Sequence, residues 1–587
     1  MRNSLYLRLL LSFIICHLAI SNVAAQGWPA NYSGVMLQGF YWDSYADTRW
    51  SNLESQADEL SQFFELIWVP NSAYANATSN NMGYHPVYWF DHRSAFGTEA
   101  QLRSMIKTFK NKGTGIIEDV VINHRASVNA NWLNFPAETY KGVTYQLTAS
   151  DICQDDEAKD NGYKPTGAKD TGEPWGGARD LDHTCQNVQN NVKAYEDFLL
   201  NDLGYVGFRY DFVKGYAPKY VGMYNQAANV TYSVGECWDG NKTVVTNWLN
   251  GTKLDGKIQS AAFDFPMKYY INDAFADGKW SRLNGGALCD DDNYKRYAVT
   301  FVDNHDTGRF GECPLYANVE AANAYILSLP GTPCVWLSHW KTYKTAIKKQ
   351  ILIRHAAGIT NESQILTKQA STQGYTLCVQ GTKGKVLLLL GGDTENAGNT
   401  AEDNYKVALE GTNYRLYVSG NVDLSALDDI KEDTFIAPDC CTVNDGEVCA
   451  FFEAPANTTW STVKCWAWDS KNNYTGGTWP GAVCTKVGTN NGKNIWKWSY
   501  SGTLTTLPAY IIFNNNNNGQ QTPDLDFHNG GYYTESGALQ GVVTDIQGIS
   551  AESSLSPAEN RYYNLNGQQV EPNRPGIYIR NGKKYIK

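Results

Sequence analysis

Two charged side chains stand in an otherwise apolar stretch, GFRYDFVKGY, at residues 207–216. Read as a strand, this stretch places Arg209 and Asp211 on the same side, because side chains alternate between the two faces with period two. Two interpretations are open. The pair is either an ion pair at a strand end, the commoner case for one isolated stretch, or a catalytic carboxylate that its arginine keeps ionised.

Similar polar side chains follow several other apolar stretches of the chain. Each comes at or just after the end of an expected strand and could transfer protons, stabilise charge or bind a metal. These residues are Asp119, Asn123, His124, Lys214, Glu236, His305 and Asp306. A single carboxylate at a strand end is weak evidence. Several of them, with two histidines and an arginine, are difficult to explain as separate surface ion pairs.

Such a set suits hydrolysis of a glycosidic bond. A retaining glycosidase needs one carboxylate as nucleophile and one carboxylic acid about 5 Å away to protonate the leaving oxygen. Asp211 beside Arg209 would stay ionised, as a nucleophile must. Glu236 lies between VG and CW, and this less polar setting favours a raised pKa and the role of general acid and then general base.

The elements that must position these residues are eight apolar runs of β type, which alternate with helical patterns. The runs occupy residues 35–42, 64–71, 115–124, 207–212, 232–238, 261–266, 298–306 and 333–337. Two intervening segments, 50–64 and 97–113, show helical spacing with Gly or Ser at their boundaries. The pattern predicts an α/β fold of the (β/α)8 TIM barrel class. Barrel enzymes build their active sites at the C-terminal ends of the strands, where the polar residues lie.

The chain is too long for one ordinary domain, and its composition changes along its length. About eighty residues separate the third and fourth strands, a length at which a structureless loop is uncommon. After the barrel, alternating runs predict an antiparallel β-domain and then a Trp-rich β-segment. The predicted parts are a signal peptide (1–25), the catalytic barrel (26–358) with an inserted domain (125–182), the β-domain (359–430), a β-sandwich module (450–533) and a tail (545–587).

Composition limits the partners and the compartment. A net charge of −11 and a pI near 5.4 argue against nucleic acid as a partner. The start has a basic, an apolar and a small-residue region, so we expect a secretory signal cleaved after Ala25, and no later segment approaches a membrane span. Of the 13 cysteines, only Cys16 lies within this signal. The other twelve are an even number, which suits disulfide pairing in an oxidising compartment. The disulfides that we expect are Cys153 with Cys185 and Cys289 with Cys313.

Four motifs resemble, in order and spacing, the signature regions of the alpha-amylase superfamily of glycoside hydrolases: DVVINH, GFRYDFVKGY, VGECWD and FVDNHDT. LQGFYWDS, GYHP, ARDLDH and GTPC add to the resemblance over about residues 30–430, and DFVKGY is most similar to plant-type alpha-amylases. The resemblance implies Asp211 as nucleophile, Glu236 as acid/base and Asp306 as the carboxylate that stabilises the transition state. The residues that it places around the cleaved bond are Tyr84, His124, Arg209 and His305, with Lys214 and Trp238 toward the leaving group.

The same resemblance implies a calcium site. Its side-chain ligands are Asn123, Asp170 and Asp180, and its backbone oxygens belong to Glu173 and Gly215. Calcium takes six to eight oxygen ligands, and such an ion would join the inserted domain to the third and fourth strands. The alternative is that DTGEPWGGARD is only an acidic loop.

The Trp-rich segment 463–481, together with 510–525, resembles family 26 starch-binding modules. Trp466 and Trp468 alternate onto one face of an expected strand, and Trp479 follows a turn-rich loop. Rings on one face suit stacking on sugars, whereas a core built of tryptophan is the alternative. The tail resembles C-terminal segments of secreted Bacteroidetes proteins, some of which act as sorting signals.

The sequence therefore predicts a secreted, calcium-dependent, endo-acting alpha-amylase that cleaves α-1,4-glucosidic bonds of starch with retention of configuration. Its partners would be starch and α-glucan oligosaccharides, and we expect the protein to be a monomer. We expect its location to be extracellular, at the cell surface or periplasmic. The alternatives within the superfamily are a debranching enzyme and a glucanotransferase, against which ARDLDH argues. A non-catalytic starch-capture protein is the alternative from another class, although binding alone needs no acid/base carboxylate.

Overall fold

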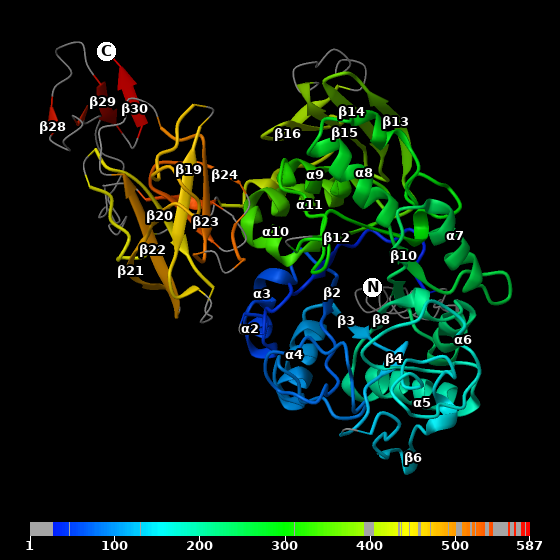
Figure 1. The fold of residues 1–587 in the computed structure, drawn as a ribbon. Coiled ribbons are helices and arrows are strands. Elements are labelled where there is room, and N and C mark those ends of the chain that lie inside the picture. The colour runs from blue at the N-terminus through cyan, green and yellow to red at the C-terminus, as the bar shows by residue number, and fades with distance from the viewer. Residues whose placement is uncertain are drawn as a thin grey trace, which may run out of the picture. The chain divides into compact units, whose positions relative to one another are not determined.

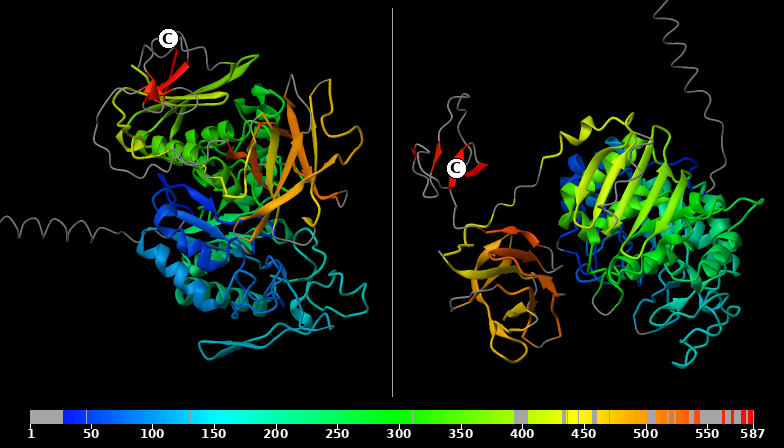
Figure 2. Two further views of the ribbon diagram at one scale, coloured as in Figure 1. Left: turned by 90° about the vertical axis from the view of Figure 1, so that its left-hand side faces the viewer. Right: turned by 90° about the horizontal axis from the view of Figure 1, so that it is seen from above.

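The structure of the chain is a computed structural model that describes residues 27–543 and four short strands between 562 and 586. The positions outside the description within 27–543 are 46, 130, 310–311, 393–403, 432–434, 436, 445, 456–459, 470, 491, 501–506, 517–518, 523 and 535–538. The predicted signal peptide, 1–25, lies outside the described residues. The chain divides into two compact units, Met1–Thr434 and Phe435–Lys587 (Figure 1, Figure 2).

Eight parallel strands of the first unit close into a barrel, and each of the eight apolar runs supplies one of them. The predicted fold class is confirmed. The strands are β1 (Met36–Gln38), β2 (Leu66–Val69), β3 (Gly115–Val120), β8 (Gly207–Tyr210), β9 (Tyr232–Gly235), β10 (Ala261–Phe263), β11 (Ala298–Phe301) and β12 (Thr332–Trp336). Their order around the ring is β1, β12, β11, β10, β9, β8, β3 and β2.

Helices alternate with these strands along the chain (Figure 1). In α4, Thr98 and Gln101 form a reciprocal capping box that fixes the first turn, and Leu102, Ile106 and Phe109 form its buried face. The helices are α2 (Trp50–Ser55), α3 (Ala57–Leu60), α4 (Glu99–Asn111), α5 (Gln186–Asp197), α6 (Lys219–Ala228), α7 (Lys242–Gly251), α8 (Phe265–Phe275), α9 (Val319–Ser328), α10 (Leu337–Thr342) and α11 (Lys344–Ala357). None of the helices in the described part of the chain combines the length and the apolar character needed to cross a membrane.

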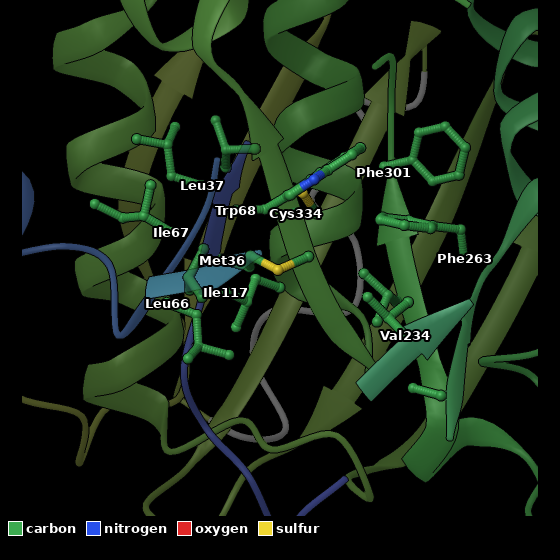
Figure 3. Close-up of a cluster of buried hydrophobic side chains, with 14 of the residues drawn as sticks. Met36, Leu37, Leu66, Ile67, Trp68, Ile117, Val234, Phe263, Phe301 and Cys334 are labelled. Atoms are coloured by element: carbon green, nitrogen blue, oxygen red, sulfur yellow. The ribbon is translucent and has the colours of Figure 1, made fainter. Parts of the chain in front are cut away.

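Alternating side chains of the strands fill the barrel interior (Figure 3). Met36 and Val234 are 0% exposed and Cys334 is 3% exposed. The ring of Trp68 packs against Phe263, with centroids 5.3 Å apart. Each fully buried side chain of this size contributes about 1.5–3 kcal/mol to stability. The interior is therefore a packed core, which leaves the ends of the strands as the place for a ligand.

Residues between β3 and β8 include the inserted region. β4 (His124–Arg125) pairs with β7 (Arg179–Asp180), and β5 (Glu138–Tyr140) pairs with β6 (Val143–Tyr145). The first pair places His124 opposite Asp180. Because His124 follows β3 within a few residues, this pairing ties the inserted region to the end of a barrel strand.

The cysteines depart from expectation. Among the described residues, no disulfide joins Cys153 to Cys185 or Cys289 to Cys313, so neither of the expected pairs is formed. The thiol of Cys185 donates to a carboxylate oxygen of Asp151 at 3.0 Å, and the thiol of Cys289 faces the neighbouring aspartate at 3.7 Å. The even count of cysteines was a poor guide, because pairing depends on which side chains the fold brings together.

A five-stranded antiparallel sheet follows the barrel, in the order β13, β14, β15, β17, β16. Its strands are β13 (Gln364–Ala370), β14 (Gly374–Gln380), β15 (Lys385–Gly391), β16 (Lys406–Gly411) and β17 (Tyr414–Val418). On β15, Val386, Leu388 and Leu390 are at most 1% exposed and belong to the same hydrophobic core as the barrel.

The second unit contains a four-stranded sheet of the tail, in the order β28-β27-β29-β30, and two sheets of the Trp-rich module, in the orders β21-β22-β18-β25-β26 and β20-β19-β23-β24. Their strands are β18 (Val448–Glu453), β19 (Lys464–Trp468), β20 (Ala482–Val483), β21 (Thr485–Asn490), β22 (Lys493–Tyr500), β23 (Tyr510–Asn514), β24 (Leu525–Asp526), β25 (Gly531–Thr534) and β26 (Leu539–Val542). One apolar core joins residues of both sheets, including Phe452, Trp498 and Phe513. The tail contributes β27 (Tyr562–Tyr563), β28 (Gln569–Val570), β29 (Ile577–Arg580) and β30 (Lys583–Ile586), and its role as a sorting segment stays a prediction.

Candidate active site

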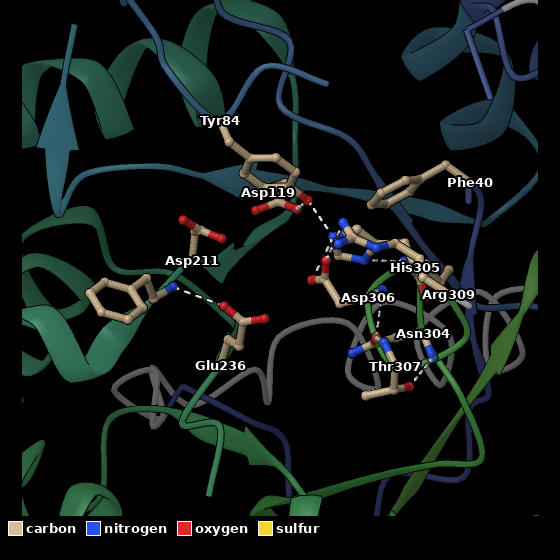
Figure 4. A network of polar contacts seen from close by, with 12 residues as sticks. Phe40, Tyr84, Asp119, Asp211, Glu236, Asn304, His305, Asp306, Thr307 and Arg309 are labelled. Carbon is tan, nitrogen blue, oxygen red and sulfur yellow. Dashed lines mark hydrogen bonds and ion pairs between the residues drawn. The ribbon is translucent and has the colours of Figure 1, made fainter. Parts of the chain in front are cut away.

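The carboxylates expected to be catalytic lie at the C-terminal ends of three barrel strands (Figure 4). Asp211 follows β8 directly, Glu236 follows β9 directly, and Asp306 lies in the loop after β11. β8 and β9 are hydrogen-bonded neighbours, whereas β10 lies between β9 and β11. Asp211 and Glu236 are therefore adjacent on the barrel rim, and Asp306 faces them from further around it.

One guanidinium binds three carboxylates in this site. Nη1 of Arg209 donates to Oδ1 of Asp119 at 2.6 Å and to Oδ1 of Asp211 at 2.7 Å. Its Nη2 donates to Oε1 of Glu236 at 2.6 Å. The arrangement follows from the barrel, because β3 and β9 both pair with β8 and Asp119 is in register with Arg209. The ion pair expected from GFRYDFVKGY exists, and it is part of a larger buried cluster.

Burial and the charges of Asp211 and Asp306 raise the pKa of Glu236 to about 8, against the opposing effect of Arg209. The raised pKa favours the protonated form of Glu236, which is the form that a general acid needs. Its Oε2 accepts a hydrogen bond at 3.0 Å from the backbone N–H of Phe212, the residue after the nucleophile. This bond fixes the candidate acid relative to the candidate nucleophile.

Two neutral histidines lie beside the carboxylates. Nε2 of His305 lies 2.6 Å from the Tyr84 hydroxyl and 3.1 Å from Oδ2 of Asp306, and burial lowers the pKa of His305 well below its usual value. Nε2 of His124 lies 2.8 Å from the carbonyl oxygen of Tyr84, and burial lowers the pKa of His124 to about 4. Neutral imidazoles can bond sugar hydroxyls without adding charge to the site.

A cavity of about 690 Å³ lies over the carboxylates and is lined by aromatic rings. Trp42 follows β1 and Trp238 follows β9, and these two strands stand opposite each other in the ring of eight. The other aromatic residues of the lining are Tyr45, Tyr84, Trp175 and Phe212. Aromatic surface therefore flanks the carboxylates on both sides, as stacking on consecutive sugar rings requires.

Lys214 and Trp238 also line this cavity. Nζ of Lys214 lies 2.9 Å from Oε1 of Glu173 and 3.5 Å from Oδ2 of Asp239. The ring of Trp238 stacks on Phe265, with centroids 5.3 Å apart. The structure thus brings every residue predicted for catalysis and substrate binding to the same end of the barrel.

Among the residues of the cavity lining that sequence reasoning missed are Trp42, Trp175 and Arg309. The guanidinium of Arg309 lies 4.3 Å from the centre of the Trp42 ring, and its Nη1 lies 3.6 Å from Oδ1 of Asp306. Trp42 and Trp175 stand inside the motifs LQGFYWDS and DTGEPWGGARD, so a search of those motifs for exposed rings could have found them. No pattern in the sequence marks Arg309.

The residues expected to bind calcium lie together beside the cavity. Nδ2 of Asn123 donates to Oδ1 of Asp180 at 3.2 Å, and Oδ1 of Asn123 packs on the backbone of Gly215, where an added Cβ would come within 2.0 Å of it. The N–H of Glu173 donates, at 2.9 Å, to the carbonyl group just before Gly215. Asn123, Asp180, Glu173 and Gly215 are thus close neighbours near the end of β3.

Two observations describe the charge in this region. Oδ2 of Asp170 is buried without a hydrogen-bond partner, and burial with the nearby charge of Asp170 raises the pKa of Asp180 to about 8. The described residues contain no group of three or more His, Cys, Asp or Glu side chains arranged to hold a metal ion. A cation here would therefore depend on the amide oxygen and on backbone oxygens as well as on the two carboxylates.

The three tryptophans predicted to bind starch lie on the outer side of their sheet. On β19, Trp466 and Trp468 are half-buried and alternate with fully buried residues. Trp479 is 45% exposed, with its ring centroid 5.9 Å from that of Trp466. Tyr510, on the neighbouring β23, is 43% exposed and lies 5.5 Å from Trp468. Other tryptophans fill the core of the module, namely Trp460, Trp496 and Trp498.

The fold and the site define a glycoside hydrolase built on a (β/α)8 barrel. Residues 64–339 match the family model of the alpha amylase catalytic domain, and residues 450–527 match that of starch-binding module 26. The chain therefore contains a catalytic domain of the alpha-amylase family joined to a starch-binding module. The resemblances to the alpha-amylase superfamily and to family 26 starch-binding modules are confirmed.

Two sequence relatives have names that agree with this assignment. The probable alpha-amylase 2 of Arabidopsis thaliana is 29% identical over 374 residues, which cover 59% of this chain and 86% of the relative. The glucan 1,4-alpha-maltotetraohydrolase of Stutzerimonas stutzeri is 28% identical over 494 residues, which cover 78% of this chain and 86% of the relative. The crystal structure of an alpha-amylase from Geobacillus thermoleovorans complexed with acarbose superposes with a TM-score of 0.48 at 13% identity, covering 66% of this chain and 98% of that one.

Proposed function

We propose that this chain is a secreted, endo-acting alpha-amylase that hydrolyses α-1,4-glucosidic bonds of starch and related glucans with retention of configuration. The observation that carries the proposal is the buried guanidinium of Arg209, which holds Asp211 and Glu236 side by side. Endo action is supported by the aromatic surface on opposite sides of the carboxylates, because a glucan can then continue past the cleaved bond in both directions. Secretion is supported by residues 1–25 alone, and a monomer stays a prediction.

The proposed reaction has two displacements. A carboxylate oxygen of Asp211 attacks the anomeric carbon while Glu236 protonates the glycosidic oxygen, so the bond to the leaving chain breaks and a glycosyl ester forms. Glu236, now ionised, takes a proton from water, whose oxygen attacks the same carbon and frees Asp211. Asp306 stabilises the positive charge that develops at the anomeric carbon in both transition states. Two inversions at one carbon retain its configuration.

The test is the identity of the first products from soluble starch. NMR early in the reaction should show α-anomers, and chromatography should show a mixture of chain lengths while the iodine stain is lost quickly. β-Anomers would exclude retention. A single product length, such as the name of the Stutzerimonas stutzeri relative denotes, would replace endo action by exo action. Release of reducing ends from pullulan would indicate a debranching enzyme. Disproportionation of maltotriose would indicate a glucanotransferase, and the absence of any product would indicate a starch-capture protein.

We further propose that calcium binds at Asn123, Asp170 and Asp180, with backbone oxygens of Glu173 and Gly215. The donor set is made of oxygen atoms, as calcium prefers, and the unpartnered buried Oδ2 of Asp170 calls for a cation. When bound, the ion would supply positive charge where the inserted region meets the end of β3. The neighbouring turn 213–215 follows the candidate nucleophile, so the ion would also stabilise the backbone beside Asp211.

Removal of calcium is expected to lower the melting temperature of the catalytic unit. An ion present at a hundred times its dissociation constant stabilises the folded state by about 2.7 kcal/mol, which corresponds to roughly 3 °C for a unit of about 400 residues. Calorimetry with and without chelator measures the shift, and added calcium should reverse it. Asp180→Ala should melt early and ignore the chelator, whereas Asp160→Ala, at an exposed position of the insert, should respond as the parent does. A melting curve that chelator leaves unchanged would refute the site.

Loss of one outward ring of the module should weaken binding to starch granules. Trp479→Ala is expected to reduce granule affinity about 5-fold, since an aromatic stack contributes on the order of 1 kcal/mol. Sedimentation with granules measures binding, and hydrolysis of maltoheptaose should stay unchanged because that substrate fits the barrel site alone. Leu366→Ala, an exposed apolar position outside the module, serves as the control. Unaltered granule binding by Trp466→Ala, Trp468→Ala and Trp479→Ala would show that these rings bind no starch.

A further inference from the structure

One face of α8 binds the loop that carries Asp306. Lys268, Asn272 and Phe275 are spaced four and three residues apart, so they lie on the same side of the helix. Each bonds a different point of segment 303–318. Nζ of Lys268 donates to Oδ1 of Asp303 at 2.7 Å. Nδ2 of Asn272 donates to the carbonyl oxygen of Cys313 at 2.7 Å, and Nδ2 of Asn318 donates to the carbonyl oxygen of Phe275 at 2.8 Å.

Asp303 is the centre of this arrangement. Its side chain is 1% exposed and that of Lys268 is 0% exposed. Oδ1 of Asp303 also accepts from the hydroxyl of Thr307 at 3.1 Å, and Oδ2 accepts from the N–H of Leu315 at 3.0 Å. Nε2 of His339, on α10, lies 3.6 Å from Oδ2. One carboxylate therefore joins α8 to both the beginning and the end of the loop.

The path from Asp303 to Asp306 is short and consists of hydrogen bonds. Oδ1 of Asn304 accepts from the N–H of Asp306 at 2.9 Å and from the N–H of Thr307 at 2.8 Å. The hydroxyl of Thr307 in turn accepts from the N–H of Asn304 at 3.0 Å (Figure 4). The turn that carries Asp306 is thus closed on itself and bonded directly to Asp303 through Thr307.

We propose that Lys268 and Asp303 are positioning residues that hold Asp306 at the place where it stabilises the transition state. The inference rests on the proposed function, because it requires Asp306 to be catalytic. A buried ion pair is weak as a device for stability, since desolvation of both charges offsets their attraction. A displacement of about 1 Å in a reacting group can cost about 100-fold in rate, so a rigid buried bond behind the loop can affect turnover through the position of Asp306 as well as affecting the fold.

Kinetics of Lys268→Met in two backgrounds test the inference, with a nitrophenyl maltooligosaccharide as substrate so that slow variants stay measurable. In the parent chain the change should lower kcat about 10- to 100-fold and alter KM less than about 3-fold. In the Asp306→Asn background the same change should alter kcat less than about 3-fold, because the group being positioned is already gone. Equal losses in both backgrounds, or an unchanged kcat in the parent, would overturn the proposal.

Two further variants separate positioning from general damage. Thr307→Val removes only the hydroxyl that joins Asp303 to the turn, so it should fold where Lys268→Met fails and should lower kcat about 2- to 10-fold. Glu138→Gln breaks the buried ion pair with Arg125 elsewhere in the catalytic unit, and it should lower the melting temperature while leaving kcat intact. If Asp306→Asn alone keeps full activity, the proposed role of Asp306 fails, and that outcome is distinct from an unchanged Lys268→Met.

Discussion

A kcat reduced by about 10⁴-fold or more is the expected result of replacing Asp211 with asparagine. The amide has nearly the shape of the carboxylate but cannot form the glycosyl ester, so the first displacement has no nucleophile. The fold should persist, because Arg209 keeps its bonds to Asp119 and Glu236. Turnover of soluble starch at saturating concentration measures the loss, and granule binding by the second unit should be unaffected.

A small external nucleophile sharpens this test. In Asp211→Gly, azide fits the space left by the side chain and should attack the anomeric carbon from the same face, which yields a β-glycosyl azide. The matched control is Asp202→Asn, which removes a carboxylate paired with Arg103 in an exposed position and should change kcat less than 2-fold. An Asp211→Asn enzyme that keeps a tenth of the parent's activity would show that another group is the nucleophile.

The second large effect is expected at Glu236. Glutamine keeps the hydrogen bond from the N–H of Phe212 but has no proton to give, so kcat on starch should fall about 10²- to 10⁴-fold. A substrate whose leaving group needs no proton separates this role from others. Formation of the glycosyl ester from maltosyl fluoride should be nearly as fast in Glu236→Gln as in the parent, and an equally large loss on both substrates would contradict the assignment.

The pH profile gives an independent check on the same residue. The pKa of Glu236 is raised to about 8, and the reaction needs the protonated form. In the parent, kcat/KM should therefore be constant through neutral pH and fall as pH rises past about 8. The limb on the alkaline side should disappear in Glu236→Gln, since its amide does not titrate. A limb that survives the substitution belongs to another group.

The barrel and the positions of its candidate catalytic carboxylates could be predicted because local patterns determine them. Each β run is a short, largely apolar segment, several of them carry polar residues at or near their ends, and all eight became strands of one closed ring. In a parallel barrel the C-terminal ends meet at one rim, so Asp211, Glu236 and Asp306 had to come together once the eight strands were recognised. The outward position of Trp466 and Trp468 likewise followed from the alternation of side chains along one strand.

Contacts between segments far apart in the chain could not be predicted in this way. The sequence pointed to Arg209 and Asp211 as a pair, but Asp119 and Glu236 reach the same guanidinium only because β3 and β9 flank β8. Arg309 lies over Trp42 through loop geometry that no periodicity records. The expected disulfides failed for the same reason, since the number and spacing of cysteines contain no information about distance in space.

Trp42 and Trp238 follow strands on opposite sides of the barrel, and this placement affects how the two sides of the cavity can be changed by substitution. The two rings stand on loops from strands on opposite sides of the ring and pack against different partners, Arg309 for one and Phe265 for the other. Effects of substitutions that share no neighbours usually add. Substitutions in the loop after β1 and in the loop after β9 should therefore alter the two sides of the cavity independently, and the carboxylates between the two loops need not change in either case.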